Sequence, residues 1–317
     1  MATCQEGHAL RSIEAGRPDR STRGWRFVLA WFSRYWLAVG FGTIFVLRAR
    51  FLVATGDGFD ARLYIEASRT WLSGGDPWGF LLDGYGYAAP PPSLIATAPL
   101  TLLPPEIAPH LVVVGAAAAA ILTIRRLGLP WWWLLFPPLL EAVWNGTLDA
   151  YLVLLIVSGQ GWLAAVAKVY AAVPLALLGR WRQLAILAVV LVATAPLLPW
   201  SAYLQRLPEI SERLAVQSIG GMSATAIPVL LPIAVAALLL LGRRATWLVV
   251  PSLWPSSQWY YGVIALPSLA RTPLVAAAMS IPIPGLIVAG LAAQVAWDRV
   301  APRYRSGATR TDPSLSE

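Results

Sequence analysis

The stretch LVVVGAAAAAILTI, residues 111–124, contains no charged residue and consists of small and aliphatic side chains apart from one threonine. With its flanks it approaches the roughly 20 residues that an α-helix needs to cross a bilayer. Similar apolar runs recur from residue 27 to residue 298 of this 317-residue chain, in which 57% of residues are hydrophobic and 13% are charged. The composition predicts an all-α fold, a polytopic bundle of about 9–11 transmembrane helices in the cell membrane.

One transmembrane domain, residues 27–298, is expected between two disordered tails, residues 1–26 and 299–317. External loops are expected at 56–89 and 200–222. The apolar runs predict helices near 32–54, 91–104, 107–125, 130–143, 147–158, 161–179, 183–199, 223–242, 245–255 and 258–270, followed by an apolar stretch at 273–297.

The net charge of +8 comes mainly from arginines in the tails and loops rather than from one basic face. This distribution argues against a nucleic-acid partner and is typical of topology signals. The positive-inside rule places the arginine-rich N-terminal tail in the cytoplasm and the 56–89 loop outside. One cysteine and two histidines disfavour a metal centre, so we expect no metal and no cofactor.

The carboxylates are concentrated in one external segment, GDGFDARLYIEASRTWLSGGDPWG at 56–79. Five of the sixteen acidic residues of the chain fall between residues 57 and 83. Positions 60, 64, 67 and 71 share one stripe of a predicted amphipathic helix that would lie on the membrane surface. Asp57 and Asp60 have two interpretations: they cap the helix and stabilise its dipole, or one of them is catalytic. The concentration of acids favours a catalytic role.

Several motifs follow one another in a specific order. Asp60 and Tyr64 form DxxxY, and a Ser-Trp turn late in the chain is followed by Tyr260 and Tyr261. The full series is DxxxY, GGDPW (74–78), YGYAAPPPSLIATAPLTLLP (85–104), NGTLDAYLVLLI (145–156), AAVAKVYAAVPLALLGRWR (164–182), QSIGG (217–221) and WPSSQWYYG (254–262). This order resembles the membrane-embedded GT-C glycosyltransferases, and most closely their branch of polyprenyl-phosphate-mannose-dependent α-mannosyltransferases. The tyrosines stand where that family often carries a histidine.

The resemblance implies that a sugar moves from a polyprenyl-phosphate donor to a lipid or glycan acceptor at the outer membrane face, with inversion. It gives Asp60 the role of general base, with Asp57 as the runner-up, and it implies mannose, although spacing does not distinguish mannose from a pentose such as arabinofuranose. Further substrate contacts are expected from Tyr64, Trp71, Tyr87, Lys168, Arg206, Arg213, Ser218, Gln258 and Trp259.

Each expected substrate contact also has a simpler interpretation. Arg206 and Arg213 would anchor the protein at the membrane interface by snorkelling. Lys168 lies in an apolar helix and would pair with Glu141 or Asp149. Aromatic residues of the external loop would belong to an interfacial belt, and the residues of the late turn would simply pack.

Two other classes of function stay open. A transporter or lipid flippase would use Glu141, Asp149 and Lys168 as an ion relay. A non-catalytic scaffold would keep the fold without the reaction. The absence of an inverted repeat and the external position of the acids favour the enzyme.

Overall fold

The computed structural model describes residues 20–217, 223–255 and 257–308, and about 74% of the chain is helical. The predicted all-α class is confirmed, since the described residues contain only one short β-hairpin besides helices. Helix α1 (Arg20–Thr55) begins inside the predicted N-terminal tail, and α15 (Leu286–Ala308) continues past the predicted start of the C-terminal tail. The rest of both predicted tails lies outside the described residues.

The first predicted external loop contains a helix, as expected, and a hairpin that was not expected. Asp83 and Gly84 form the hairpin turn with φ values of 51° and 82°, the pattern that two-residue Asp-Gly turns require. Asp83 therefore has a structural role. The elements of this region are α2 (Phe59–Leu72), β1 (Leu81–Leu82), β2 (Tyr85–Gly86), α3 (Pro92–Thr97) and the 3₁₀ helix η1 (Ala98–Leu102).

The middle of the chain is made of short helices separated by sharp breaks. The expected helices at 130–143 and 161–179 are both interrupted, the second at Lys168, whose backbone is extended. The elements are α4 (Ala108–Arg126), η2 (Trp131–Leu135), α5 (Pro137–Trp144), α6 (Asp149–Val157), α7 (Gly161–Ala167), η3 (Val169–Ala171), α8 (Ala172–Leu177) and α9 (Trp181–Thr194).

The second predicted external loop, 200–222, is mostly helical, because helix α10 (Trp200–Gln217) occupies most of it. Its apolar residues recur at helical spacing, and Tyr203, Ile210 and Leu214 pack on the α2 region. The remaining elements are η4 (Ala224–Ala226), η5 (Pro228–Leu230), α11 (Leu231–Leu241), η6 (Gly242–Ala245), α12 (Val249–Leu253), η7 (Trp259–Ala265), α13 (Leu266–Leu269) and α14 (Pro273–Met279).

Two segments of the described chain, Ala108–Arg126 and Pro228–Ala245, are long and apolar enough to cross a membrane. Helices α5 and α6 together reach that length but meet at a bend of 114°. These segments support a membrane location. They are fewer than the transmembrane helices predicted from the sequence, because several apolar runs fold as short helices separated by proline or glycine.

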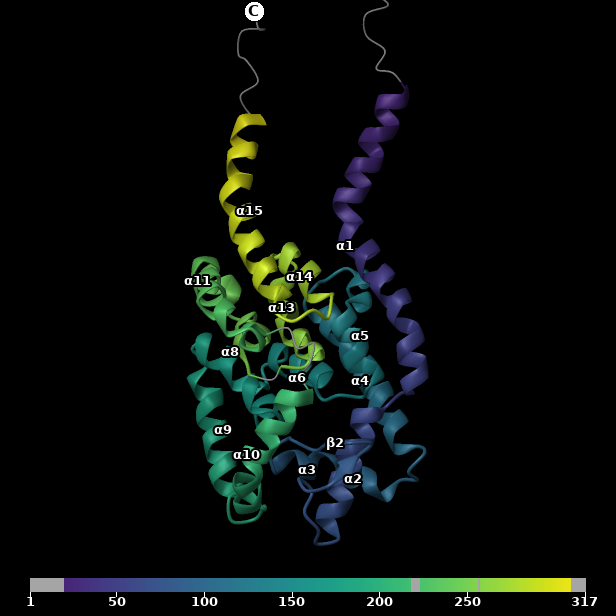
Figure 1. Cartoon of the computed structure of the whole chain (residues 1–317), viewed down its shortest axis with the longest axis vertical. Helices are drawn as coiled ribbons and strands as arrows, with labels where there is room; N and C mark the ends of the chain where they lie inside the picture. Colours follow the sequence, from purple (N-terminus) through teal and green to yellow (C-terminus); the bar gives the residue numbers. More distant parts are fainter. Residues whose placement is uncertain (1–19, 218–222, 256, 309–317) are drawn as a thin grey trace, which may run out of the picture.

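Two hydrophobic clusters form the interior. The larger one lies among α1, α4–α9 and α11–α15, and the smaller one joins α2, the hairpin, α3 and α10. Figure 1 shows α2, α3 and α10 at one end of the molecule, whereas α1 and α15 rise towards the other end. Leu148 packs against both clusters, so the α5–α6 break lies where the two meet.

Candidate functional site

The N-terminus of α2 is fixed on the break between α5 and α6. The Gly58 amide donates to the Trp144 carbonyl at 2.8 Å, and the Asp60 amide donates to the Asn145 carbonyl at 2.9 Å. These bonds satisfy amides that the first turn of a helix leaves unpaired. A side chain at Gly146 would come within 2.8 Å of the Ala61 Cβ, so the two segments touch closely. Asp60 is therefore held at the junction of the two clusters.

The Asp60 carboxylate lies in an unusual electrostatic environment. It is partly exposed, yet protein surrounds it closely enough that burial raises its pKa from the ordinary 3.8 to about 6. The positive charge of Lys168 and a hydrogen bond donated by the Tyr260 hydroxyl oppose this rise in pKa. A carboxylate with a pKa near 6 is ionised at neutral pH and is a stronger base than an ordinary aspartate.

Neither Asp57 nor Asp60 caps helix α2 through a side-chain hydrogen bond. The N-cap of α2 is Gly58, with φ of 68°, and no side chain caps the helix. Asp57 instead pairs with His110, whose Nδ1 lies 2.9 Å from Oδ2 in an exposed position. Asp60 lies in the first turn, where its charge also interacts with the helix dipole.

A buried polar network lies next to Asp60. The Lys168 Nζ is 2.7 Å from the Asp149 Oδ2, and the Tyr170 hydroxyl donates to the other oxygen of Asp149. Asp149 is thus the partner of Lys168, whereas Glu141 pairs with Arg48 at 2.7 Å. The extended backbone at the α7–η3 break brings Lys168 into this position.

Three tyrosines surround the Lys168 ammonium. Its Nζ lies 5.7, 5.4 and 5.0 Å from the ring centroids of Tyr170, Tyr260 and Tyr261. Such distances permit cation–π attraction, which strengthens away from water. Because Tyr260 also bonds to Asp60, the network runs from Asp60 through Tyr260 and Lys168 to Asp149. We call these residues, with Tyr170 and Tyr261, the Asp60–Lys168 network.

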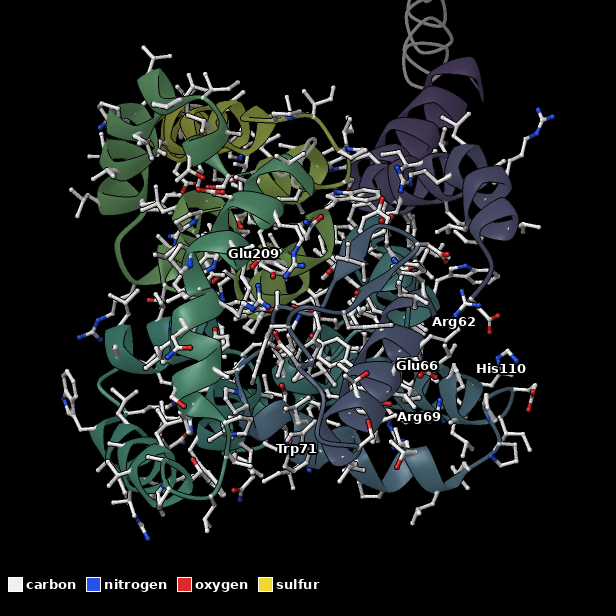
Figure 2. The ribbon with its side chains drawn as sticks, turned by 60° about the horizontal axis from the view of Figure 1, so that its bottom comes forward. Arg62, Glu66, Arg69, Trp71, His110 and Glu209 are labelled. Carbon is white, nitrogen blue, oxygen red and sulfur yellow. The ribbon has the colours of Figure 1, made fainter. Side chains whose placement is uncertain are left out.

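The aromatic residues predicted to contact a sugar are mostly packed against protein. Tyr64 and Tyr87 are buried, with ring centroids 5.3 Å apart, and the Tyr87 hydroxyl bonds to Ser93. Trp71 is partly buried at the far end of α2. The polar side of the helix faces outward, as Figure 2 shows for Arg62, Glu66 and Arg69.

Helix α2 was predicted to lie on the membrane surface, but its apolar side is covered by protein. Its buried residues pack on α3, η1 and α4. This packing, rather than lipid, accounts for the amphipathic pattern of the sequence.

The structure distinguishes the two arginines predicted to bind phosphate. Arg206 is exposed and pairs with Asp76 at 2.9 Å and with Glu209 at 2.6 Å. Arg213 is half-buried and donates to the backbone carbonyls of Trp78 and Tyr87 at 3.2 and 3.5 Å. Within the described part of the chain, no carboxylate lies within ion-pairing distance of Arg213. Its positive charge therefore remains available to an anion.

The other predicted contacts have different outcomes. Trp259 is buried, donates from Nε1 to the Met279 carbonyl at 2.7 Å, and lies 4.5 Å beneath the Arg48 guanidinium. Gln258 precedes η7, where its carbonyl accepts from the Tyr261 amide. Trp259 thus packs a turn, and Ser218 lies outside the described residues.

Sequence reasoning did not assign Tyr170, Tyr260 or His110 to the site. Tyr170 follows Lys168 by two residues. In a continuous helix this spacing would put the two side chains on different faces, and only the break at Lys168 brings them together. The two late tyrosines were noticed as a departure from a motif, but their approach to Asp60 depends on tertiary packing.

Comparisons with known protein families, with curated proteins and with solved structures find no significant match to this chain.

Proposed function

We propose that this protein is a multi-pass membrane glycosyltransferase that moves a sugar, mannose in the first instance, from a polyprenyl-phosphate donor to a lipid or glycan acceptor. The observation that carries the proposal is the position of Asp60. Its carboxylate has a pKa near 6, stays partly exposed, and lies beside the charged Lys168–Asp149 pair at the junction of two apolar clusters. A polyprenyl donor needs both surroundings, because its chain is apolar and its phosphate is charged.

The reaction is a single displacement. Asp60 takes the proton of the acceptor hydroxyl while the acceptor oxygen attacks the anomeric carbon. The bond from that carbon to the phosphate oxygen breaks, its electron pair leaves with polyprenyl phosphate, and the configuration inverts. Because phosphate is a good leaving group, one base and one cation are sufficient without a metal.

Arg213 is the residue that we assign to the donor phosphate. Its charge is not neutralised by a carboxylate in the described chain, unlike that of Arg206. It is linked to the helix that carries Asp60 through packed neighbours, since it bonds to the Tyr87 carbonyl and the Tyr87 ring contacts Tyr64 of α2. A guanidinium can bind phosphate through two parallel hydrogen bonds.

Lys168 and Tyr260 act as positioning residues in this proposal. Lys168 forms an ion pair with Asp149, so its charge is already neutralised without a substrate. Together with the Tyr260 hydrogen bond, its field keeps the pKa of Asp60 from rising further. Asp60 then remains ionised at neutral pH.

Contacts between the two predicted external regions support an extracytoplasmic site. The Arg206–Asp76 pair and the bonds from Arg213 to Trp78 and Tyr87 join α10 to the 73–89 segment. Both regions therefore lie at one end of the molecule, opposite the start of α1 (Figure 1). The positive-inside rule places the arginine-rich N-terminal tail in the cytoplasm.

The test is release of polyprenyl phosphate by the purified protein in nanodiscs, supplied with polyprenyl-phosphate mannose and a lipid extract as acceptor. We expect release that requires the acceptor, and a new mannolipid by mass spectrometry. Comparing the membrane glycolipids of cells with and without the gene would identify the natural product. Absence of release with both mannosyl and arabinofuranosyl donors, from folded protein, would contradict the proposal.

A transporter is the second candidate, and one observation favours it. The α5–α6 pair is bent by 114° and carries Asp149, which is buried against Lys168, at the start of its second half. Broken helices with intramembrane charges are common at transport sites. Transport would move a lipid or ion across a vesicle membrane with no release of polyprenyl phosphate.

A further inference from the structure

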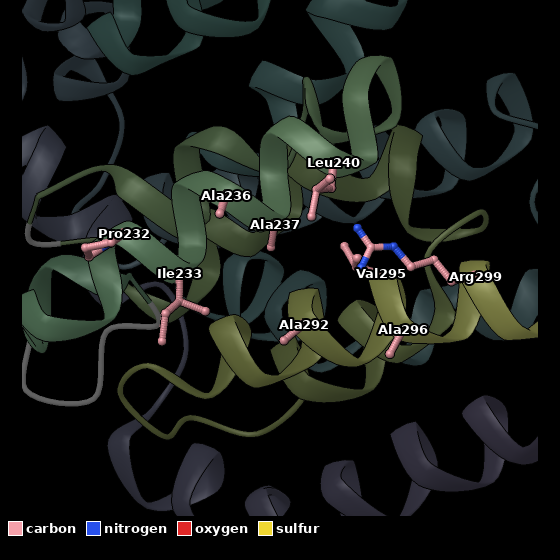
Figure 3. Close-up of a pocket in the computed structure, with 9 residues that line it drawn as sticks. All are labelled: Pro232, Ile233, Ala236, Ala237, Leu240, Ala292, Val295, Ala296 and Arg299. Atoms are coloured by element: carbon pink, nitrogen blue, oxygen red, sulfur yellow. The ribbon is translucent and has the colours of Figure 1, made fainter.

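A second site lies far from Asp60 in the chain, between α11 and α15. Figure 3 shows the two helices running side by side in the same direction. The groove between them has a volume of about 420 Å³. Its lining is apolar except at one end, and none of its residues belongs to the Asp60–Lys168 network. The principal lining residues are Ile233, Ala236, Leu240, Ala292, Ala296 and Arg299.

The groove opens towards the outside of the molecule. Ile233 and Leu240 on its rim are 49% and 59% exposed, and the neighbouring Leu239 is 76% exposed. Alanines on both helices leave the space between these larger side chains. Since α11 belongs to a candidate membrane span, the exposed apolar rim would face lipid hydrocarbon.

One end of the groove is positively charged. Arg299 extends over the end marked by Leu240 (Figure 3). Asp298 is already engaged, because it pairs with Arg244 at 2.9 Å and accepts from the Gln294 amide at 3.0 Å. In the part of the chain that the structure describes, Arg299 has no carboxylate within ion-pairing distance. This end therefore carries uncompensated positive charge.

Trp297 and the length of the groove indicate that the Arg299 end of the groove lies at a membrane boundary. Trp297 is 57% exposed, and tryptophan is enriched at the level of lipid headgroups. The groove extends along α11 from Pro232 to Leu240, a distance of about 12 Å at the rise of an α-helix. One leaflet contributes about half of the roughly 30 Å hydrocarbon core. A single acyl chain with its headgroup at Arg299 matches these dimensions.

We propose that the α11–α15 groove binds an anionic phospholipid, with one acyl chain between the helices and the phosphate at Arg299. The lipid belongs to the leaflet on the side where α15 ends. This inference depends on the membrane location of the chain but not on glycosyl transfer. Its success or failure is therefore separate from that of the proposed enzyme.

The experiment measures lipid binding by native mass spectrometry of the full chain in detergent, titrated with phosphatidylglycerol or with zwitterionic phosphatidylcholine. We expect a phosphatidylglycerol adduct of higher affinity than the phosphatidylcholine adduct. Arg299→Gln should weaken phosphatidylglycerol binding about fivefold, because one arginine near the headgroup is lost. Ala292→Phe should fill the groove and reduce the binding of both lipids.

Helix α9 offers matched controls, because Arg182 and Ala188 are exposed on it. Arg182→Gln and Ala188→Phe should leave lipid affinity unchanged. Equal affinity for the two lipids in the wild type would overturn the proposal, as would unchanged affinity in both Arg299→Gln and Ala292→Phe. If Ala292→Phe instead converted a dimer to a monomer with lipid binding intact, the groove would be a contact between copies, which also overturns it.

Discussion

Replacing Asp60 with asparagine should make the protein more stable at neutral pH while removing its activity. Asparagine has nearly the same shape and keeps an oxygen that can accept the Tyr260 hydrogen bond. It has no charge to bury. The pKa of Asp60 is about 6 against an ordinary 3.8, and this difference corresponds to about 3 kcal/mol of destabilisation once the carboxyl is ionised.

The pH dependence gives the sign of this effect. Because the folded-state pKa is raised, the protonated carboxyl contributes stability that is fully present below pH 3.8 and is lost as the pH rises through about 6. At pH 7.5 Asp60→Asn should therefore unfold several °C above the wild type. The difference should shrink towards zero near pH 4. Thermal unfolding in detergent, followed from pH 4 to pH 8, measures it.

Glu66→Gln is the matched control, since Glu66 lies on the outer side of the same helix and pairs with Arg69. A surface ion pair of this kind contributes less than about 1 kcal/mol. The reasoning is refuted if Asp60→Asn is less stable than the wild type at pH 7.5, because the carboxylate would then make a net stabilising contact. A stability gain that does not depend on pH would also refute it.

Three further predictions concern the packing around the site. Lys168→Met should lower the yield of folded protein, measured by size-exclusion chromatography, since the unpaired buried carboxylate of Asp149 costs about 3–5 kcal/mol. The double variant Lys168→Met with Asp149→Asn should restore part of that yield. Gly86→Ala should displace the Arg213 guanidinium, whose Cζ would lie 2.2 Å from the new Cβ, and should lower turnover as much as Arg213→Gln does. Gly146→Ala should lower the melting temperature more than Gly128→Ala, because both glycines have φ near +65° but only Gly146 touches α2.

The sequence predicted elements best where local signals agree. Helix α4 was expected at 107–125 and is observed at Ala108–Arg126, because a long apolar run forms the helix and Gly128, with φ of 64°, ends it two residues after Arg126. Helix α10 was not predicted because its polar residues and the internal Pro208 are typical of a loop between apolar runs. The break at Lys168 was also missed, since neither proline nor glycine marks it.

The candidate site was predictable in part for similar reasons. Asp60 and Tyr64 lie one turn apart on α2, which the spacing indicated. The choice between Asp149 and Glu141 as partner of Lys168 was not predictable, because it depends on how α6 and η3 pack. The approach of Tyr260 to Asp60 joins residues 200 positions apart and depends on tertiary structure alone.

The most direct test of the central claim is the pH profile of kcat/KM for sugar transfer from polyprenyl-phosphate mannose by the wild type, Asp57→Asn and Asp60→Asn in nanodiscs. If Asp60 is the base, the wild-type rate should rise with pH to a plateau, with a midpoint near its pKa of about 6. On the plateau above pH 7, Asp60→Asn should be at least about a hundredfold slower, and the gap should narrow as the pH falls below 6, whereas Asp57→Asn should keep most of the rate at every pH. Normal turnover by Asp60→Asn with loss in Asp57→Asn would move the base to Asp57, and normal turnover by both variants would contradict the mechanism.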